Sequence, residues 1–213
     1  HKLRRIASAG FSSFFVDIAM GILTVLFNRQ ILRYLNGDAL AIYSIIISIS
    51  TIVQCCAYSV GHASQPLLST NFGADQGRRI RETLRYALGT TAFFGLFWTA
   101  VSLAVPNVYI HLFMTPTPNV LAIAPAIIRT YALSFLLLPF NIFSTYYFQA
   151  VMRPGMAFAI SVGRGAVLSG LLILLLPAVA GADTIWFAMP VTEVVVAVYA
   201  AAVMFRGARR FPG

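Results

Sequence analysis

The stretch VGHASQPLLSTNFGADQGRRIRETLRYAL, residues 60–88, decides how this chain is organised. An apolar segment reaches Gln65-Pro66, passes through the turn-forming residues 71–74, and restarts with a run rich in arginine. Asn and Gly favour turns, and a basic loop between two apolar segments is typical of a cytoplasmic connection between membrane spans. The stretch therefore predicts a point where the chain turns back into a membrane.

The composition extends this interpretation to the whole chain. Its 213 residues are 59% hydrophobic and only 10% charged, whereas soluble domains have about 25% charged residues. Uncharged segments long enough to cross roughly 30 Å of hydrocarbon recur along the sequence. Lipid offers no partner to an unpaired backbone amide and no barrel-like alternation is visible, so we expect helices. The six predicted spans are residues 6–34, 39–69, 86–113, 120–149, 157–179 and 184–205.

Only short polar connections separate these spans. We therefore expect one domain over residues 1–213, an all-α polytopic bundle of six transmembrane helices. Residues 78–88 leave two possibilities open, because Ile80, Leu84 and Leu88 recur at helical spacing while the arginines fall elsewhere around the helix. This segment either lies at the membrane interface or extends the third helix into the cytoplasm.

The net charge of +9 sorts by side of the membrane. The basic residues before the first span, in two loops and at the end of the chain are Lys2, Arg4, Arg5, Arg78, Arg79, Arg81, Arg85, Arg153, Arg206, Arg209 and Arg210. The opposite side has Arg29 and Arg33. This excess predicts a membrane protein with both termini cytoplasmic, its basic residues in contact with anionic headgroups. We expect no nucleic-acid partner, because no soluble basic domain with base-stacking aromatics is present.

Asp17 is an acidic residue inside the first span, flanked by Val16 and Ile18. A carboxylate at this depth is costly in lipid unless it faces a cavity or a partner, so we expect it to point inward. There it either binds the coupling ion, a proton or Na⁺, or serves structure through hydrogen bonds or an arginine partner. We favour the coupling role.

Glu193 lies inside the last span, and Arg129 and Arg164 lie inside the fourth and fifth spans. Burying two opposite charges together costs less than burying either one alone. We therefore favour a structural ion pair between Glu193 and one of the two arginines. The alternative is that Glu193 is a second ion-coupling residue.

His62 belongs to a polar stripe on the second half of the second helix. It is either a titrating ion-coupling site or, as we favour, a neutral histidine hydrogen-bonded within the bundle. Polar and aromatic residues on the second and fourth helices fit lipophilic cations through apolar contacts and ring faces, although tyrosines near an interface also serve as membrane anchors. The predicted substrate-cavity residues are Gln54, Tyr58, Gln65, Asn141 and Tyr146.

Sequence motifs of catalysis are missing. The chain contains no Walker loop, no His-Glu-x-x-His and no nucleophile elbow. Cys55 and Cys56 are adjacent and lack the spacing of metal ligands. We expect no enzyme activity, no metal site and no cofactor other than a coupling ion, H⁺ or Na⁺.

Nearly the whole chain resembles the second, C-terminal six-helix lobe of the multidrug and toxic compound extrusion (MATE) transporters. The resemblance rests on four places, which are Asn28-Arg29 with Gly37, Gln65-Pro66 with Asn71-Phe72-Gly73-Ala74 and the basic run, Phe148-Gln149-Ala150 before Arg153-Pro154, and Ile185-Trp186-Phe187-Ala188-Met189-Pro190. It implies a protein of the bacterial inner membrane, with twelve helices in two lobes, that exports cationic drugs in exchange for H⁺ or Na⁺. It also places Asp17 near an acidic residue that some members use for coupling.

The resemblance further implies a missing first lobe of the same polypeptide, and His1 within a basic stretch fits a lobe excised from a longer transporter. The expected partners are thus the lipid bilayer, small cationic organic compounds and that first lobe. Two alternatives stay open. A lipid-linked saccharide flippase would have Arg129 and Arg164 along its cavity, whereas a non-transporting membrane scaffold would have Asp17 and His62 packed against protein and no polar cavity.

Overall fold

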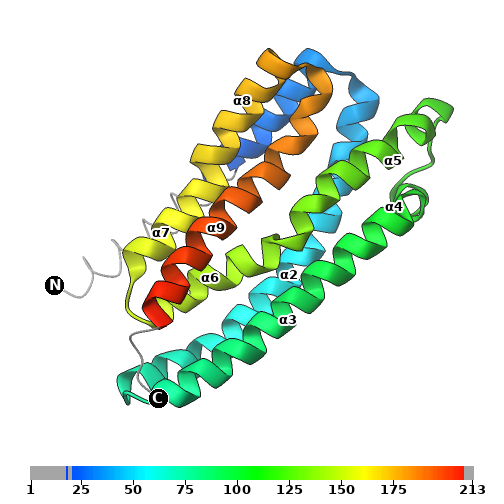
Figure 1. The fold of residues 1–213 in the computed structure, drawn as a ribbon. Coiled ribbons are helices and arrows are strands. Elements are labelled where there is room, and N and C mark those ends of the chain that lie inside the picture. Colours follow the sequence, from blue (N-terminus) through cyan, green and yellow to red (C-terminus); the bar gives the residue numbers. More distant parts are fainter. Residues whose placement is uncertain (1–17, 19–20, 209–213) are drawn as a thin grey trace.

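The structure is a computed structural model, and it describes residue 18 and residues 21–208. The described part is an elongated bundle of helices without a β-strand (Figure 1). Residues 21–34 are helical and lead into the two longest helices, α2 (Gly37–Gly73) and α3 (Gly77–Ala104), which lie side by side. The remaining elements are α4 (Pro106–Phe113), α5 (Pro118–Ala132), the 3-10 turn η1 (Leu133–Leu136), α6 (Leu138–Ala150), α7 (Pro154–Val162), the π-helical turn η2 (Gly163–Val167), α8 (Leu168–Ala180), the 3-10 helix η3 (Ala182–Phe187) and α9 (Ala188–Ala208).

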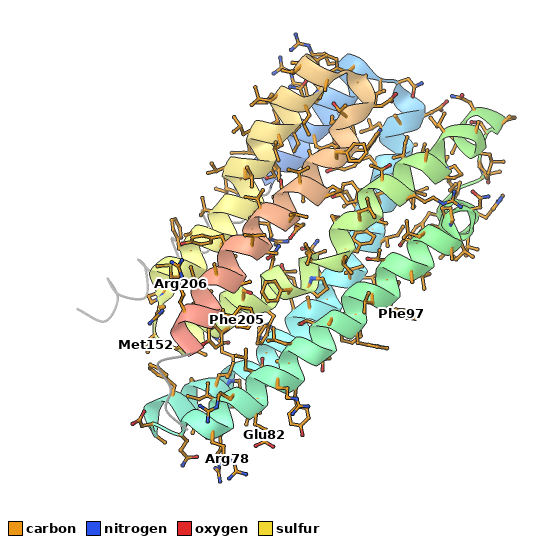
Figure 2. All side chains as sticks on the ribbon, viewed as in Figure 1. Arg78, Glu82, Phe97, Met152, Phe205 and Arg206 are labelled. Atoms are coloured by element: carbon orange, nitrogen blue, oxygen red, sulfur yellow. The ribbon has the colours of Figure 1, made fainter. Side chains whose placement is uncertain are left out.

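Helical stretches long and apolar enough to cross a membrane number 5 in the described residues. They are Gly37–Gly73, Gly77–Ala104, Pro118–Ala150, Pro154–Ala180 and Ala182–Arg206. These stretches correspond to the second to sixth predicted spans, and the all-α membrane bundle predicted from the sequence is confirmed. Large apolar side chains such as Phe97 and Phe205 point outward from the bundle, as lipid-facing residues do (Figure 2). Of the predicted span 6–34, residue 18 and residues 21–34 are described, and the other residues lie outside the described part of the chain.

The third span has other bounds than the predicted 86–113. Its helix α3 ends at Ala104, because Pro106 has no backbone N–H and disfavours helical geometry at Val105, where φ is −130°. A separate short helix, α4, begins at the proline. At its other end α3 starts at Gly77, so the basic segment is continuous with the third helix.

Two other spans contain irregular turns. Pro139 lacks the N–H that would bond the carbonyl of Phe135, four residues before it, so the regular helix is interrupted at η1, α5 stops at Ala132 and α6 begins at Leu138. The π-helical turn η2 separates α7 from α8. Such turns are frequent at functional sites, because the wider turn displaces a side chain from the regular helical position. Here the displaced stretch carries Arg164.

Helix α3 approaches η1 so closely that only glycine fits at position 95. A Cβ atom on Gly95 would collide with the carbonyl oxygen of Leu136. Thr91 and Thr99 are buried on the same face, and the Thr99 hydroxyl donates a hydrogen bond of 3.4 Å to the carbonyl of Ala132. Small residues at a close helix contact are typical of packing within membranes.

We expect Gly95→Ala to lower the free energy of unfolding by roughly 1–3 kcal/mol, because a backbone carbonyl cannot move aside as a side-chain end can. Gly89→Ala on the same helix is the matched control, since a Cβ there meets nothing within 4 Å. The control should be neutral or stabilising, because alanine favours helix over glycine. Thermal unfolding in detergent measures both, and equal Tm values for the two variants would contradict the close contact.

Buried apolar side chains form two clusters along the bundle. One includes Phe27, Ile46 and Leu138, and the other includes Phe143 and Val196. Where the two clusters meet, buried polar residues occur on α6 (Asn141 and Ser144) and on α9 (Thr192 and Glu193). A polar layer therefore crosses the bundle interior at this level.

Candidate functional site

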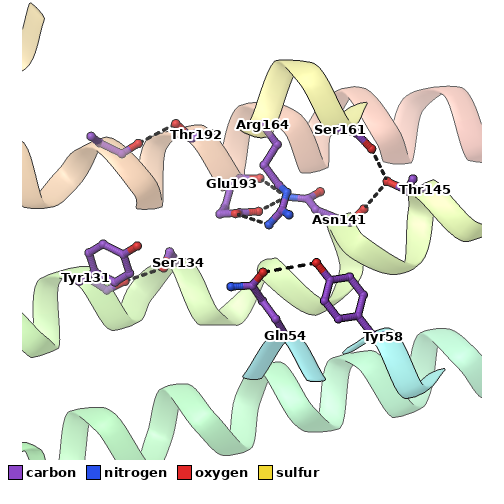
Figure 3. Close-up of polar contacts among 11 residues, drawn as sticks. Gln54, Tyr58, Tyr131, Ser134, Asn141, Thr145, Ser161, Arg164, Thr192 and Glu193 are labelled. Atoms are coloured by element: carbon purple, nitrogen blue, oxygen red, sulfur yellow. Dashed lines mark hydrogen bonds and ion pairs between the residues drawn. The ribbon is translucent and has the colours of Figure 1, made fainter. Parts of the chain in front are cut away.

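Glu193, Arg164 and Asn141 form the centre of this polar layer, and we call them the charge cluster (Figure 3). A guanidinium nitrogen of Arg164 lies 3.3 Å from Oε1 of Glu193. The Asn141 amide nitrogen donates to Oε2 of Glu193 at 2.6 Å and to the Glu193 backbone carbonyl at 2.9 Å. The side chain of Glu193 is 1% exposed and that of Arg164 is 12% exposed. The sequence-based expectation of a pair between Glu193 and an arginine is thus met by Arg164.

Three separate elements bring the charge cluster together. Arg164 comes from the π-helical turn η2, Asn141 from the first turn of α6 and Glu193 from α9. Glycines flank Arg164 on both sides, so little side-chain bulk stands between its guanidinium group and α9. Because η1 interrupts the helix before Pro139, α6 begins at Leu138, and Asn141 lies in its first turn. Each irregular turn thereby coincides with a partner of Glu193.

A cavity of about 70 Å³ lies next to the charge cluster. Arg164 and Glu193 line it together with Gln54, Tyr131 and Ser134. A cavity of this size and polarity has room for a few water molecules, because one water needs about 10–15 Å³ by this kind of measure. The ion pair is therefore buried but can be hydrated from one side.

Tyr146 of α6 contacts both Tyr58 and His62 of α2. The Tyr146 hydroxyl and Nε2 of His62 are 3.3 Å apart, and their rings meet edge to face at 5.0 Å between centroids. Tyr58 meets the Tyr146 ring at 6.4 Å and donates to Oε1 of Gln54 at 3.5 Å. We call this group, with Gln65 and Gln149, the α2–α6 polar face; the two glutamines are joined by a hydrogen bond of 3.2 Å.

Exposed polar side chains continue this face along α2. They are Ser44, Thr51, Tyr58, His62 and Ser69. Their spacing of four or seven residues keeps them on one side of the helix, opposite buried residues such as Val53 and Ala57. The hydroxyls of Ser44, Thr51 and Ser69 bond to carbonyls of their own helix at 3.1, 2.9 and 3.2 Å. The polarity of this side therefore rests mainly on Tyr58 and His62, which bond to other side chains. Such side chains are unfavourable against lipid, so they fit a water-filled cavity or a second part of the protein.

Gln54 connects the two regions, because it lines the cavity of the charge cluster and also binds Tyr58. Figure 3 shows Gln54 and Tyr58 on α2, across from the charge cluster. Asn141, predicted to line a substrate cavity, is instead fully buried against Glu193. Its substrate role stays a prediction.

Arg129 takes no part in the charge cluster. Its Nε donates to the carbonyl of Leu103 at 3.0 Å, and the residue is exposed. Asp17 lies outside the described residues, so its surroundings are not part of the site geometry. Within the described residues no group of three or more His, Cys, Asp and Glu side chains is placed to hold a metal ion.

Sequence reasoning missed several cavity residues. Ser50, Tyr131 and Ser134 line the cavity beside the charge cluster but belong to otherwise apolar stretches. Single hydroxyls in apolar helices are common, because they bond to their own backbone, as Ser134 does with the Tyr131 carbonyl at 2.7 Å. The one feature of the sequence that pointed to this region was Pro139, which follows Tyr131 and Ser134 closely and predicts an irregular helix there.

The described geometry defines a class of protein, a polytopic helical membrane protein with an intramembrane ion pair and a polar face on one long helix. The sequence profile of the MatE family matches residues 34–175. The chain therefore belongs to the MatE family. No curated protein sequence matches it.

Solved structures of MATE transporters share the fold. A multidrug resistance MATE family transporter of the MOP superfamily in an outward-facing conformation has a TM-score of 0.85 at 14% identity, covering 95% of this chain and 46% of that chain. An inward-facing multidrug resistance MATE family transporter has a TM-score of 0.85 at 14% identity, covering 99% and 50%. A MOP superfamily transporter from Pyrococcus furiosus, whose binding pocket is described as having reverse polarity, has a TM-score of 0.84 at 13% identity, covering 95% and 46%. The chain thus spans about half the length of these transporters.

Proposed function

We propose that the chain is the second lobe of a multidrug antiporter that exports lipophilic cationic compounds in exchange for H⁺ or Na⁺. The observation that carries the proposal is the exposed α2–α6 polar face. A chain half the length of the matched transporters leaves room for another lobe, and two lobes facing each other would enclose this face. The same TM-score against outward-facing and inward-facing transporters is what a lobe that rocks as one body would give.

The aromatic part of the polar face supports a cationic substrate. The ring of Tyr58 on α2 packs edge to face against the ring of Tyr146 on α6. The faces of such rings attract organic cations. His62 and Gln65 add hydrogen-bonding groups beside them. A flat, lipophilic cation would meet apolar contact area and negative ring faces together.

For ion coupling we propose Asp17, with the alternatives Glu193 and His62. Glu193 has two partners, Arg164 and Asn141, which is the arrangement of a structural ion pair. His62 is hydrogen-bonded to Tyr146 and exposed on the polar face, so a substrate or a proton could reach it. Asp17 is favoured by its place in the sequence, because a carboxylate between Val16 and Ile18 in an apolar span is costly unless it faces a cavity or a partner.

The two other functions receive less support. A saccharide flippase would have Arg129 and Arg164 along its cavity. Arg164 does line the cavity beside the charge cluster but is paired there with Glu193, and Arg129 is bonded to the Leu103 carbonyl instead. A closed scaffold would pack His62 against protein, but His62 is exposed and a polar cavity lies next to the charge cluster.

We also propose that the α2–α3 turn and both termini lie in the cytoplasm of a bacterium and that the chain crosses its inner membrane. The exposed arginines at the start of α3 support this orientation through the positive-inside rule.

The aromatic contacts make a direct prediction about substrate affinity. In the complete transporter, Tyr146→Ala should raise the ethidium concentration for half-maximal export by roughly 2- to 30-fold, the range expected for loss of a cation–ring contact. Tyr146→Phe keeps the ring and should have a smaller effect. Initial rates of ethidium export at several concentrations measure the change.

The matched control is Tyr199→Ala, which removes an exposed tyrosine that bonds the Met156 sulfur instead. Export by this variant should match the unmodified protein. An unchanged half-maximal concentration for Tyr146→Ala, or the same increase for Tyr199→Ala, would exclude the polar face from substrate binding.

A further inference from the structure

A second hollow lies on the outside of the bundle between α2 and α3. Its volume of about 420 Å³ lies in the range of small-molecule sites, roughly 300–1,000 Å³. Ala63 and Ala87 leave the space open, while Leu67 and Tyr86 form walls and are 54% and 69% exposed. We call this hollow the α2–α3 groove. It is separate from the charge cluster, and its binding chemistry is independent of the proposed transport function.

The walls of the groove are apolar despite their hydroxyl groups. Ser59 donates to the Cys55 carbonyl at 2.9 Å and Ser64 donates to the Val60 carbonyl at 2.6 Å. Thr90 donates to the carbonyl of Tyr86 at 2.9 Å. Because these hydroxyl protons are used within their own helices, the groove offers few donors and suits a hydrocarbon chain.

The groove lies at the depth of one membrane leaflet. With a rise of 1.5 Å per residue, Leu67 and Thr83 are about 9 Å along their helices from the α2–α3 turn, and Ser59 and Thr90 are about 20 Å from it. The groove is therefore about 11 Å long, which is less than one leaflet's half of the roughly 30 Å hydrocarbon core, so it fits within a leaflet when the turn lies outside the hydrocarbon at the headgroups. Acyl chains of that leaflet run in the same direction as the groove.

Positive charge lies at the mouth of the groove, at the depth of the lipid headgroups. Arg79 precedes Thr83 by four residues and Tyr86 by seven, which places it on the groove side of α3. Arg78 extends from the same end of the helix near Glu82 (Figure 2). The arginines of residues 75–85 outnumber Asp75 and Glu82, so this end of α3 is net positive.

We propose that the α2–α3 groove binds an anionic phospholipid. One acyl chain lies in the groove between Ala63 and Ala87, and the phosphate contacts Arg79 at the groove mouth. The apolar walls select the chain, and the arginines select a negatively charged headgroup over a zwitterionic one.

Native mass spectrometry of the detergent-purified full-length protein tests this site. The protein is incubated with equal amounts of phosphatidylglycerol and phosphatidylcholine, and the first bound lipid is counted. Phosphatidylglycerol should be retained in preference, and Arg79→Gln should lower its ratio to phosphatidylcholine about five-fold, the weight of one arginine at a headgroup. Ala63→Phe fills the groove and should reduce the binding of both lipids.

Two matched controls change exposed residues elsewhere, Arg33→Gln at the opposite end of the bundle and Ala100→Phe on α3. Both should bind lipid like the unmodified protein. Equal retention of the two lipids, or the same loss in the controls, would overturn the proposal. If Ala63→Phe lowers the yield of folded protein while the lipid ratio responds to neither groove variant, the rest of the polypeptide covers the groove and the lipid site is excluded.

Discussion

Arg164→Leu is expected to remove most of the folded protein from the membrane, because it leaves Glu193 as a buried carboxylate without its guanidinium partner. Breaking a buried ion pair from one side costs about 3–5 kcal/mol, and the Glu193 side chain is only 1% exposed. Asn141 would remain as a partner but supplies no charge. Folded protein is measured by size-exclusion chromatography of a fluorescent fusion and by its Tm.

The double variant Arg164→Leu with Glu193→Gln separates the loss of pairing from the loss of packing. Glutamine is neutral and can still accept from Asn141, so most of the folded protein should return. If the double variant gives no more folded protein than Arg164→Leu alone, the loss of folded protein does not come from the unpaired charge of Glu193. If Glu193→Gln instead folds normally and loses only ion-driven export, Glu193 is a coupling residue.

Asp17→Asn in the complete transporter is expected to abolish ion-driven drug efflux while leaving insertion and abundance nearly unchanged. Asparagine keeps the shape and can hydrogen-bond, but it neither releases a proton nor offers a full negative charge to Na⁺. Ethidium efflux against an imposed pH or Na⁺ gradient, normalised to protein in the membrane, measures the effect. Asp183→Asn, on an exposed connection, is the matched control and should export normally.

Two outcomes would remove Asp17 from the mechanism. Normal exchange by Asp17→Asn would shift the coupling role to Glu193, His62 or the first lobe. Loss of folded protein would instead assign Asp17 a structural role with an arginine partner, because an unpaired arginine in the membrane is costly.

The fold was largely predictable because hydrophobicity alone requires spanning helices in lipid. The ends of the third span were not, since the apolar run continues through Pro106 and a measure of hydrophobicity does not register the missing N–H of proline. The sequence of the basic segment before Leu88 does not distinguish a helix at the membrane interface from a cytoplasmic extension of the third span, because the helical periodicity is the same in both cases.

The site was predictable in its chemistry but less so in its geometry. A carboxylate inside a span needs a partner, which predicted the pairing of Glu193. The choice of Arg164 over Arg129 depends on the π-helical turn, and neighbouring glycines alone do not specify such a turn. Sequence also gives the depth of Asn141 but not the direction of its side chain, which is toward Glu193.

The central claim is that an ion gradient drives a lipophilic cation through the complete protein of which this chain is one lobe. The most direct measurement is uptake of labelled tetraphenylphosphonium into proteoliposomes that contain the purified full-length protein and an imposed outward H⁺ or Na⁺ gradient. We predict uptake above the level without a gradient, and its loss when an ionophore dissipates the gradient of the coupling ion. Uptake that is the same with and without either gradient would contradict the account.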